Sequence, residues 1–192
     1  MNKLTEINSY LNLLNVIEKE KKLVCLSDNN YNHFETRVGN TPFKISTPEK
    51  LREFDVHKNF RDLNMITKDL KIFISNLYLY LPFINNPIQE HIYIENTKQT
   101  TYIQNEYDSH FMTYVSVCYE KIYNYWDRIG DRMWFYFDVE IDPKKVYFPT
   151  VINQLKIKYS NDVNFEWFID FLEKDYTPLN TSRKEIVHYY QQ

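Results

Sequence analysis

One segment, residues 107–137, limits the folds open to this chain more than any other part of its sequence. Its apolar residues recur at intervals of three and four, and they are Phe111, Val115, Cys118, Ile122, Trp126, Ile129 and Met133. The polar residues Glu120, Asn124, Asp127 and Asp131 fall on another face. This pattern is typical of a long amphipathic α-helix, and such a helix needs other elements to cover its apolar stripe.

Helical patterns also occupy residues 4–23, 47–81, 143–159 and 164–174, whereas residues 91–104 alternate like a small β-hairpin. The chain contains no internal repeat and no low-complexity linker. We therefore predict an all-α fold, a helical bundle with minor β-hairpin decoration. The length favours a single domain over residues 1–192, with an N-terminal elaboration over roughly residues 1–48.

The composition excludes several classes of binding site. Only two glycines occur, Gly39 and Gly130, so glycine-rich phosphate loops of the Walker and Rossmann types are absent. Cys25 and Cys118 lie far apart without a CxxC motif, which gives neither a disulfide framework nor a zinc site. The net charge of −3 argues against a strongly basic coat for nucleic acid but allows a small basic cleft. No apolar run reaches the ~20 residues of a membrane span, so we expect a cytoplasmic protein without metal or cofactor.

The last segment, residues 182–190, carries the side chains best suited to chemistry. Ser182 and Glu185 fit a capping box, which predicts that the last helix begins at Ser182. Arg183 and Lys184 would then lie in the first turn, where free N–H groups favour an anion, so Ser182 and Lys184 are candidate substrate-binding residues. Arg183 could hold a phosphate, and His188 could move a proton to or from a ribose hydroxyl. Together they would suffice for metal-free cleavage of RNA.

The spacing of Arg183 and His188 carries little weight by itself, because Arg52 and His57 repeat it. The second pair lacks a tyrosine two residues later, and we interpret it as a pair of surface groups. On one helix, about 140° would separate Arg183 from His188, so a single copy does not stack them. Two copies beside a two-fold axis would bring two arginines and two histidines together.

Residues 183–190, Arg-Lys-Glu-Ile-Val-His-Tyr-Tyr, resemble the R-x4-H-x-Y signature of the HEPN superfamily. These are small all-α dimers that include toxin ribonucleases and CRISPR-associated nucleases. Residues 123–131, Tyr-Asn-Tyr-Trp-Asp-Arg-Ile-Gly-Asp, are similar to part of a long helix in a bacterial HEPN subfamily. The chain departs from the family pattern at Lys184, where a small polar residue is frequent. It also departs after His188, since the family's last helix normally runs on and four residues follow here.

The resemblance implies a homodimeric, metal-independent endoribonuclease of toxin or phage-defence type, with RNA as substrate and Arg183 and His188 as the nuclease pair. Tyr190 matches a tyrosine that a nucleotidyltransferase antitoxin adenylylates in some toxin pairs, so it is a candidate modification site. One alternative is a non-catalytic HEPN-type module that binds a nucleotide or a protein partner. Another is a purely structural helical protein, in which Arg183 and His188 are solvated groups at a helix end.

Three residues of the long helix complete the candidates. Asp127 and Asp131 could orient the nuclease pair, although ion pairs with Arg128 and Arg132 explain them equally well. Gly130 costs ~1 kcal/mol relative to alanine in a helix interior, which predicts that another element approaches closely there.

Overall fold

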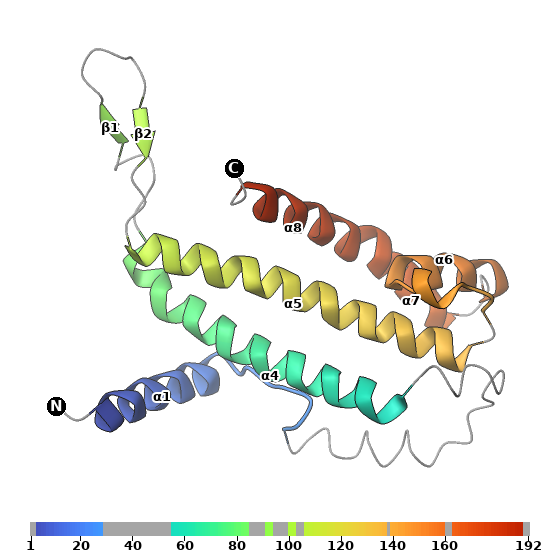
Figure 1. The fold of residues 1–192 in the computed structure, drawn as a ribbon, viewed down its shortest axis with the longest axis horizontal. Coiled ribbons are helices and arrows are strands. Elements are labelled where there is room, and N and C mark those ends of the chain that lie inside the picture. The colour runs from blue at the N-terminus through green and yellow to red at the C-terminus, as the bar shows by residue number, and fades with distance from the viewer. Residues whose placement is uncertain are drawn as a thin grey trace. The chain divides into compact units, whose positions relative to one another are not determined.

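The computed structural model describes residues 3–28, 55–84, 91–93, 100–102, 106–137, 139–159 and 163–189. Its helices are α1 (Lys3–Glu20), α4 (Val56–Tyr80), α5 (Glu106–Tyr136), α6 (Phe148–Tyr159), α7 (Val163–Phe171) and α8 (Thr177–Tyr189) (Figure 1). Single turns of 3-10 helix lie at Leu81–Phe83 and Pro143–Lys145. The predicted all-α class is confirmed, and α5 matches the predicted long helix to within one residue at each end.

Two short strands form the predicted hairpin. β1 (His91–Tyr93) pairs antiparallel with β2 (Thr100–Tyr102), with Ile92 opposite Thr101. The first residues of the helical pattern predicted over residues 47–81, up to residue 54, lie outside the described residues, and so does Arg52.

The chain divides into two compact units. The first comprises Met1–Val24 and Lys71–Cys118, and the second comprises Cys25–Leu70 and Tyr119–Gln192. Each of the long helices α4 and α5 contributes residues to both units. The expected single domain over residues 1–192 stays a prediction.

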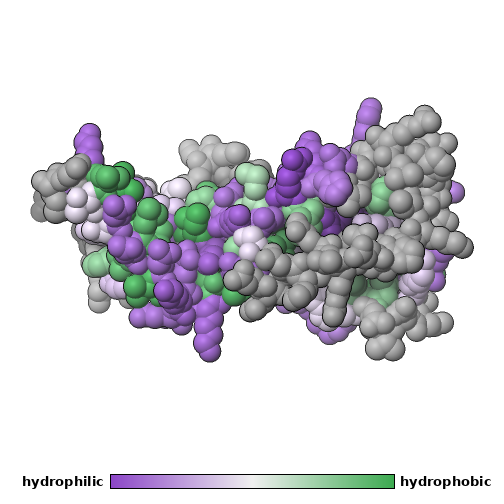
Figure 2. Space-filling model, turned by 90° about the horizontal axis from the view of Figure 1, so that it is seen from below, coloured by the Kyte–Doolittle hydropathy of each residue, from purple (hydrophilic) through white to green (hydrophobic). Residues whose placement is uncertain are grey.

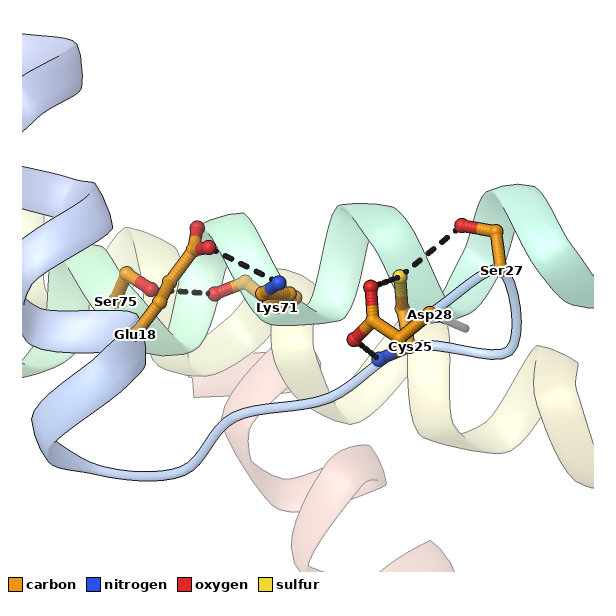
Figure 3. Close-up of polar contacts among 6 residues, drawn as sticks. All are labelled: Glu18, Cys25, Ser27, Asp28, Lys71 and Ser75. Atoms are coloured by element: carbon orange, nitrogen blue, oxygen red, sulfur yellow. Dashed lines mark hydrogen bonds and ion pairs between the residues drawn. The ribbon is translucent and has the colours of Figure 1, made fainter. Parts of the chain in front are cut away.

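In the first unit, α1 is attached by a few polar contacts and one buried leucine, Leu14. The hydroxyl of Tyr10 donates to Oδ1 of Asn76 over 2.7 Å. Nζ of Lys71 lies 3.1 Å from the carboxylate of Glu18, as Figure 3 shows. Most apolar residues of α1 remain exposed, and Figure 2 shows apolar atoms at the surface in the region of this helix. Among the helices that the structure describes, none combines the length and apolar character needed to cross a bilayer.

The core of the second unit gathers around α6, which buries Phe148, Val151, Ile152 and Leu155 completely. The first of these residues lies directly against Gly130 of α5. A Cβ atom at position 130 would lie 2.8 Å from both the backbone N and the Cα of Phe148. The predicted close approach at Gly130 is therefore confirmed, and its partner is the backbone at the start of α6.

The turn at residues 25–28 belongs to the second unit and is hydrogen-bonded to the part of α4 in the same unit. The backbone N–H of Cys25 donates to Oδ2 of Asp28 over 2.7 Å, and the Cys25 thiol lies 3.3 Å from both Asp28 and Ser27 (Figure 3). The N–H of Leu26 donates to the Thr67 hydroxyl of α4 over 3.2 Å. Cys25 and Cys118 are both buried free thiols.

The predicted helix start at Ser182 is wrong. α7 runs into a five-residue π-helical turn, Leu172–Tyr176, and α8 follows directly from Thr177. Pro178 does not interrupt the helix, because it lies in the first turn of α8. The N–H groups of a first turn have no partner within the helix, so a proline is tolerated there. The Thr177 hydroxyl donates to the carbonyl of Leu172 over 2.7 Å, and buried Leu172 and Tyr176 hold the π turn in the core. A strong tertiary anchor thus overrides the local capping signal.

The start of α8 at Thr177 changes the surroundings of three candidate residues. Ser182 lies inside α8, and Arg183 and Lys184 lie beyond its first turn. The free N–H groups of a helix start are therefore not available beside Arg183, so the predicted backbone anion site is lost. Any anion bound here has to be held by side chains.

Candidate functional site

Helix α8 places Arg183 against α5, where three side chains hold its guanidinium. Nη1 donates to both carboxylate oxygens of Glu120, over 3.0 and 3.3 Å. Nε donates to Oδ1 of Asn180 over 3.1 Å, and the central guanidinium carbon lies 4.0 Å from the ring centroid of Tyr123. We call Arg183, Glu120, Asn180 and Tyr123 the arginine clamp. Only 19% of the Arg183 side chain is exposed, so the position of its charge is well defined.

The α5 side of the clamp continues into a buried carboxyl group. Glu120, Tyr123 and Asp127 are spaced by three and four residues, so they lie on one face of the helix. The hydroxyl of Tyr123 hydrogen-bonds to Asp127, and Asp127 also accepts the backbone N–H of Phe148 over 3.3 Å. A line of contacts therefore runs from the start of α6 through Asp127 and Tyr123 to Arg183.

Burial dominates the electrostatics of this line. It raises the pKa of Asp127, although the N–H of Phe148 and the hydroxyl of Tyr123 oppose the shift by favouring the carboxylate. The pKa of Tyr123 is also raised, first by burial and then by the neighbouring Asp127. The positive charge of Arg183 opposes both of these upward pKa shifts. Its guanidinium is therefore close enough to Tyr123 and Asp127 to act on them electrostatically.

The other candidate residues are more scattered. Lys184 is exposed and Ser182 is half-buried on α8. His188 lies in the last turn of α8, but its side chain falls outside the described residues, and Tyr190 falls outside them entirely. The geometry between Arg183 and His188 therefore stays a prediction.

The structure separates the two aspartates that were candidates for orienting the pair. Asp127 joins the line of contacts to Arg183, whereas Asp131 forms an ion pair with Arg128 over 2.6 Å. Arg132 turns to α4 and donates from Nε to Oδ1 of Asn59 over 2.6 Å. His57 is exposed on α4, as expected for a surface group.

Sequence reasoning missed Glu120 as the partner of Arg183. The signal was present, because Glu120 stands on the same polar face of α5 as Asp127. What the sequence did not contain was the approach of α8 to that face. No group of three or more histidine, cysteine, aspartate or glutamate side chains placed to hold a metal ion occurs in the part of the chain that the structure describes.

The family of Cthe2314-like HEPN proteins matches residues 63–192. The chain belongs to this HEPN family. The matched span contains all of α5 to α8 and hence both sides of the arginine clamp. Searches of curated proteins and of solved structures gave no match.

Membership of the HEPN family confirms the resemblance drawn from residues 123–131 and 183–190. Both segments fall within the matched span, on α5 and at the end of α8. In this HEPN protein the clamp joins the two segments directly, because Tyr123 belongs to the first and Arg183 to the second. The clamp is thus the contact between the two sequence features that carried the resemblance.

Proposed function

We propose that this HEPN protein is a metal-independent endoribonuclease of toxin or phage-defence type that acts as a two-fold dimer. Arg183 binds the scissile phosphate and stabilises the charge that develops on it. His188 acts as general base toward the ribose 2′-hydroxyl or as general acid toward the leaving oxygen. DNA is not a substrate of this reaction, because it lacks the attacking hydroxyl.

The arginine clamp is the observation that best supports this proposal. A guanidinium fixed by Glu120, Asn180 and Tyr123 loses little side-chain entropy when it binds a phosphate. Among the described residues, no hydrogen bond uses Nη2 of Arg183, so that edge remains for the substrate. His188 lies five residues further, about 7.5 Å along the helix axis and about 140° around it. Two copies are therefore needed to gather both side chains around one phosphate.

Further residues of α8 and its continuation complete the proposed site. Exposed Lys184 and half-buried Ser182 contact phosphates next to the scissile one. Tyr190 is the proposed site of adenylylation by a nucleotidyltransferase antitoxin, which would add a bulky anion two residues from His188. Such a modification would switch the enzyme off by repulsion of RNA.

A second candidate function is a non-catalytic HEPN-type module that binds a nucleotide or a protein partner. One observation favours it: Glu120 already neutralises Arg183 through two charge-assisted hydrogen bonds. In that case the ion pair joins α8 to α5 as a structural contact, and the charge of Arg183 is not offered to RNA.

An assay for cleavage of single-stranded RNA in the presence of EDTA distinguishes the nuclease from the non-catalytic module. Arg183→Ala and His188→Ala should each abolish cleavage, with helix content and size unchanged. Arg61→Ala and His57→Ala are matched controls, because both residues are exposed on α4 away from the clamp, and both variants should cleave normally. Light scattering should give a dimer. Cleavage that survives both Arg183→Ala and His188→Ala would refute the nuclease assignment.

A further inference from the structure

The second unit contains a cleft that is separate from the arginine clamp. It has a volume of about 720 Å³ and is lined by residues of α4 and α5 together with Pro143 and Val146. None of the four clamp residues lines it. Its size is in the range of pockets that hold a small organic ligand.

Some of the polar groups in the cleft already have partners. Lys121 forms an ion pair with Asp69 over 2.5 Å, and Arg128 forms one with Asp131 over 2.6 Å. The amide of Asn59 is also committed, because its oxygen accepts from Arg132 and its nitrogen donates to the carbonyl of Arg128. The contacts of Asp69 and Asn59 join α4 to α5 and so fix the two walls of the cleft relative to each other.

Asp55 also lines the cleft, but its Oδ1 already accepts the backbone N–H of Lys58 over 2.9 Å. Three other charged or amide side chains in the cleft remain. Lys58 and Asp62 stand four residues apart on α4, and Asn124 faces the cleft from α5. None of the three side chains makes a hydrogen bond or ion pair with another residue that the structure describes. Asp62 is half-buried, and it is close enough to Asp131 to add to the rise in the pKa of Asp131 that burial mainly causes. A carboxylate, an amide and an ammonium group are thus left facing one cavity.

The chemistry of these groups favours one RNA base. A carboxylate has two acceptor oxygens side by side, and the Watson–Crick edge of guanine offers the N1–H and N2–H donors side by side. Adenine, cytosine and uracil lack two adjacent donors on that edge. The guanine O6 beside them is an acceptor for the N–H of an amide or for an ammonium group. Met65, Ile66 and Val146 supply apolar surface for the face of the ring.

We propose that this cleft is a guanine-binding subsite for single-stranded RNA. Asp62 accepts from N1–H and N2–H, Asn124 donates to O6, and Lys58 binds the adjoining phosphate. The inference rests on the proposed function only in naming RNA as the ligand. Asn124 follows Tyr123 in the sequence and Arg128 follows Asp127, so the cleft and the clamp occupy neighbouring faces of the same turns of α5. A helix is about 10 Å wide, so a strand that places a guanine in the cleft passes the clamp within a few nucleotides. The subsite would make the enzyme cleave near guanine.

Binding is measured by fluorescence anisotropy on the His188→Ala protein, so that cleavage does not interfere. The probes are short labelled oligoadenosines with a central guanosine, inosine or adenosine. The guanosine probe should bind about tenfold more tightly than the adenosine probe, and inosine, which lacks the N2 amine, should fall between them. Asp62→Asn should abolish this preference. The matched control is Asp175→Asn, an exposed aspartate outside the cleft, which should keep it.

Two outcomes would overturn the subsite: equal binding of the guanosine and adenosine probes, or a full guanine preference in Asp62→Asn with native circular dichroism. A different result would refute the nuclease but not the subsite. A guanine preference that depends on Asp62, found in a protein whose wild type does not cleave RNA, would refute the nuclease and leave the subsite standing.

Discussion

The contact between Gly130 and the start of α6 predicts that Gly130→Ala destabilises the second unit. A Cβ at this position would lie 2.8 Å from the N and Cα atoms of Phe148 and 3.2 Å from the carbonyl carbon of Tyr147. All three are backbone atoms, so no side-chain rotation relieves the clash. The start of α6 has to move away from α5 instead.

Two opposing terms set the size of the effect. Alanine in a helix interior is ~1 kcal/mol more favourable than glycine. Overpacking of a well-packed site costs about 1–3 kcal/mol, and the upper end applies here because backbone has to shift. Movement of Phe148 also disturbs Val151, Ile152 and Leu155, which are completely buried. We therefore expect a net loss of about 1–2 kcal/mol in the free energy of unfolding.

Urea unfolding followed by circular dichroism measures this loss as a lower midpoint with an unchanged m-value. Asn153→Ala is the matched control, because Asn153 is exposed in the interior of α6. The control should be as stable as the wild type or slightly more so. If Gly130→Ala were equally stable, α6 would pack with room for a methyl group and the reasoning would fail.

Three further predictions concern the α8 start and the buried groups. Ser182→Ala should leave the melting temperature unchanged or slightly raised, because Ser182 lies inside α8; a loss of about 1 kcal/mol would instead indicate a helix start at this residue. Because burial raises the pKa of Asp127, the folded state binds its proton more tightly than the unfolded state, and the contribution of this carboxyl to stability falls as pH rises through the raised pKa. The stability difference between Asp127→Asn and the wild type should therefore shift toward the variant from acid to neutral pH, and parallel pH curves would contradict this. Burial raises the pKa of Cys118 to about 11, so alkylation at mildly alkaline pH, followed by mass spectrometry, should be about a hundredfold slower in the folded than in the unfolded protein. Equal labelling rates would show that the thiol is accessible.

The long helices and the hairpin were predictable because their signals are local. The apolar period of residues 107–137 fixes α5 almost to the residue, and the alternation of residues 91–104 contains the paired strands β1 and β2. The cost of glycine in a helix interior likewise indicated a close approach at Gly130 before the partner was known. In each case the information lies within the segment itself.

The start of α8 was predicted wrongly for the opposite reason. Ser182 and Glu185 fit the pattern of a capping box, and proline, here Pro178, often interrupts a helix. Buried Leu172 and Tyr176 decide otherwise, because they hold a π turn in the core and let the chain enter α8 at Thr177. The burial of these two side chains depends on distant parts of the chain, which no local pattern encodes.

By itself, then, the sequence determined the all-α class, the HEPN relationship and the identity of Arg183 and His188 as candidates. The tertiary structure alone decided that Arg183 is held by Glu120, Asn180 and Tyr123, and that Asp62 lines a separate cleft without a partner among the residues that the structure describes. The physical reason is the range of the interactions. Helix periodicity arises between residues three or four positions apart, whereas the contact between Glu120 and Arg183 spans 63 residues and exists only once α8 has packed against α5.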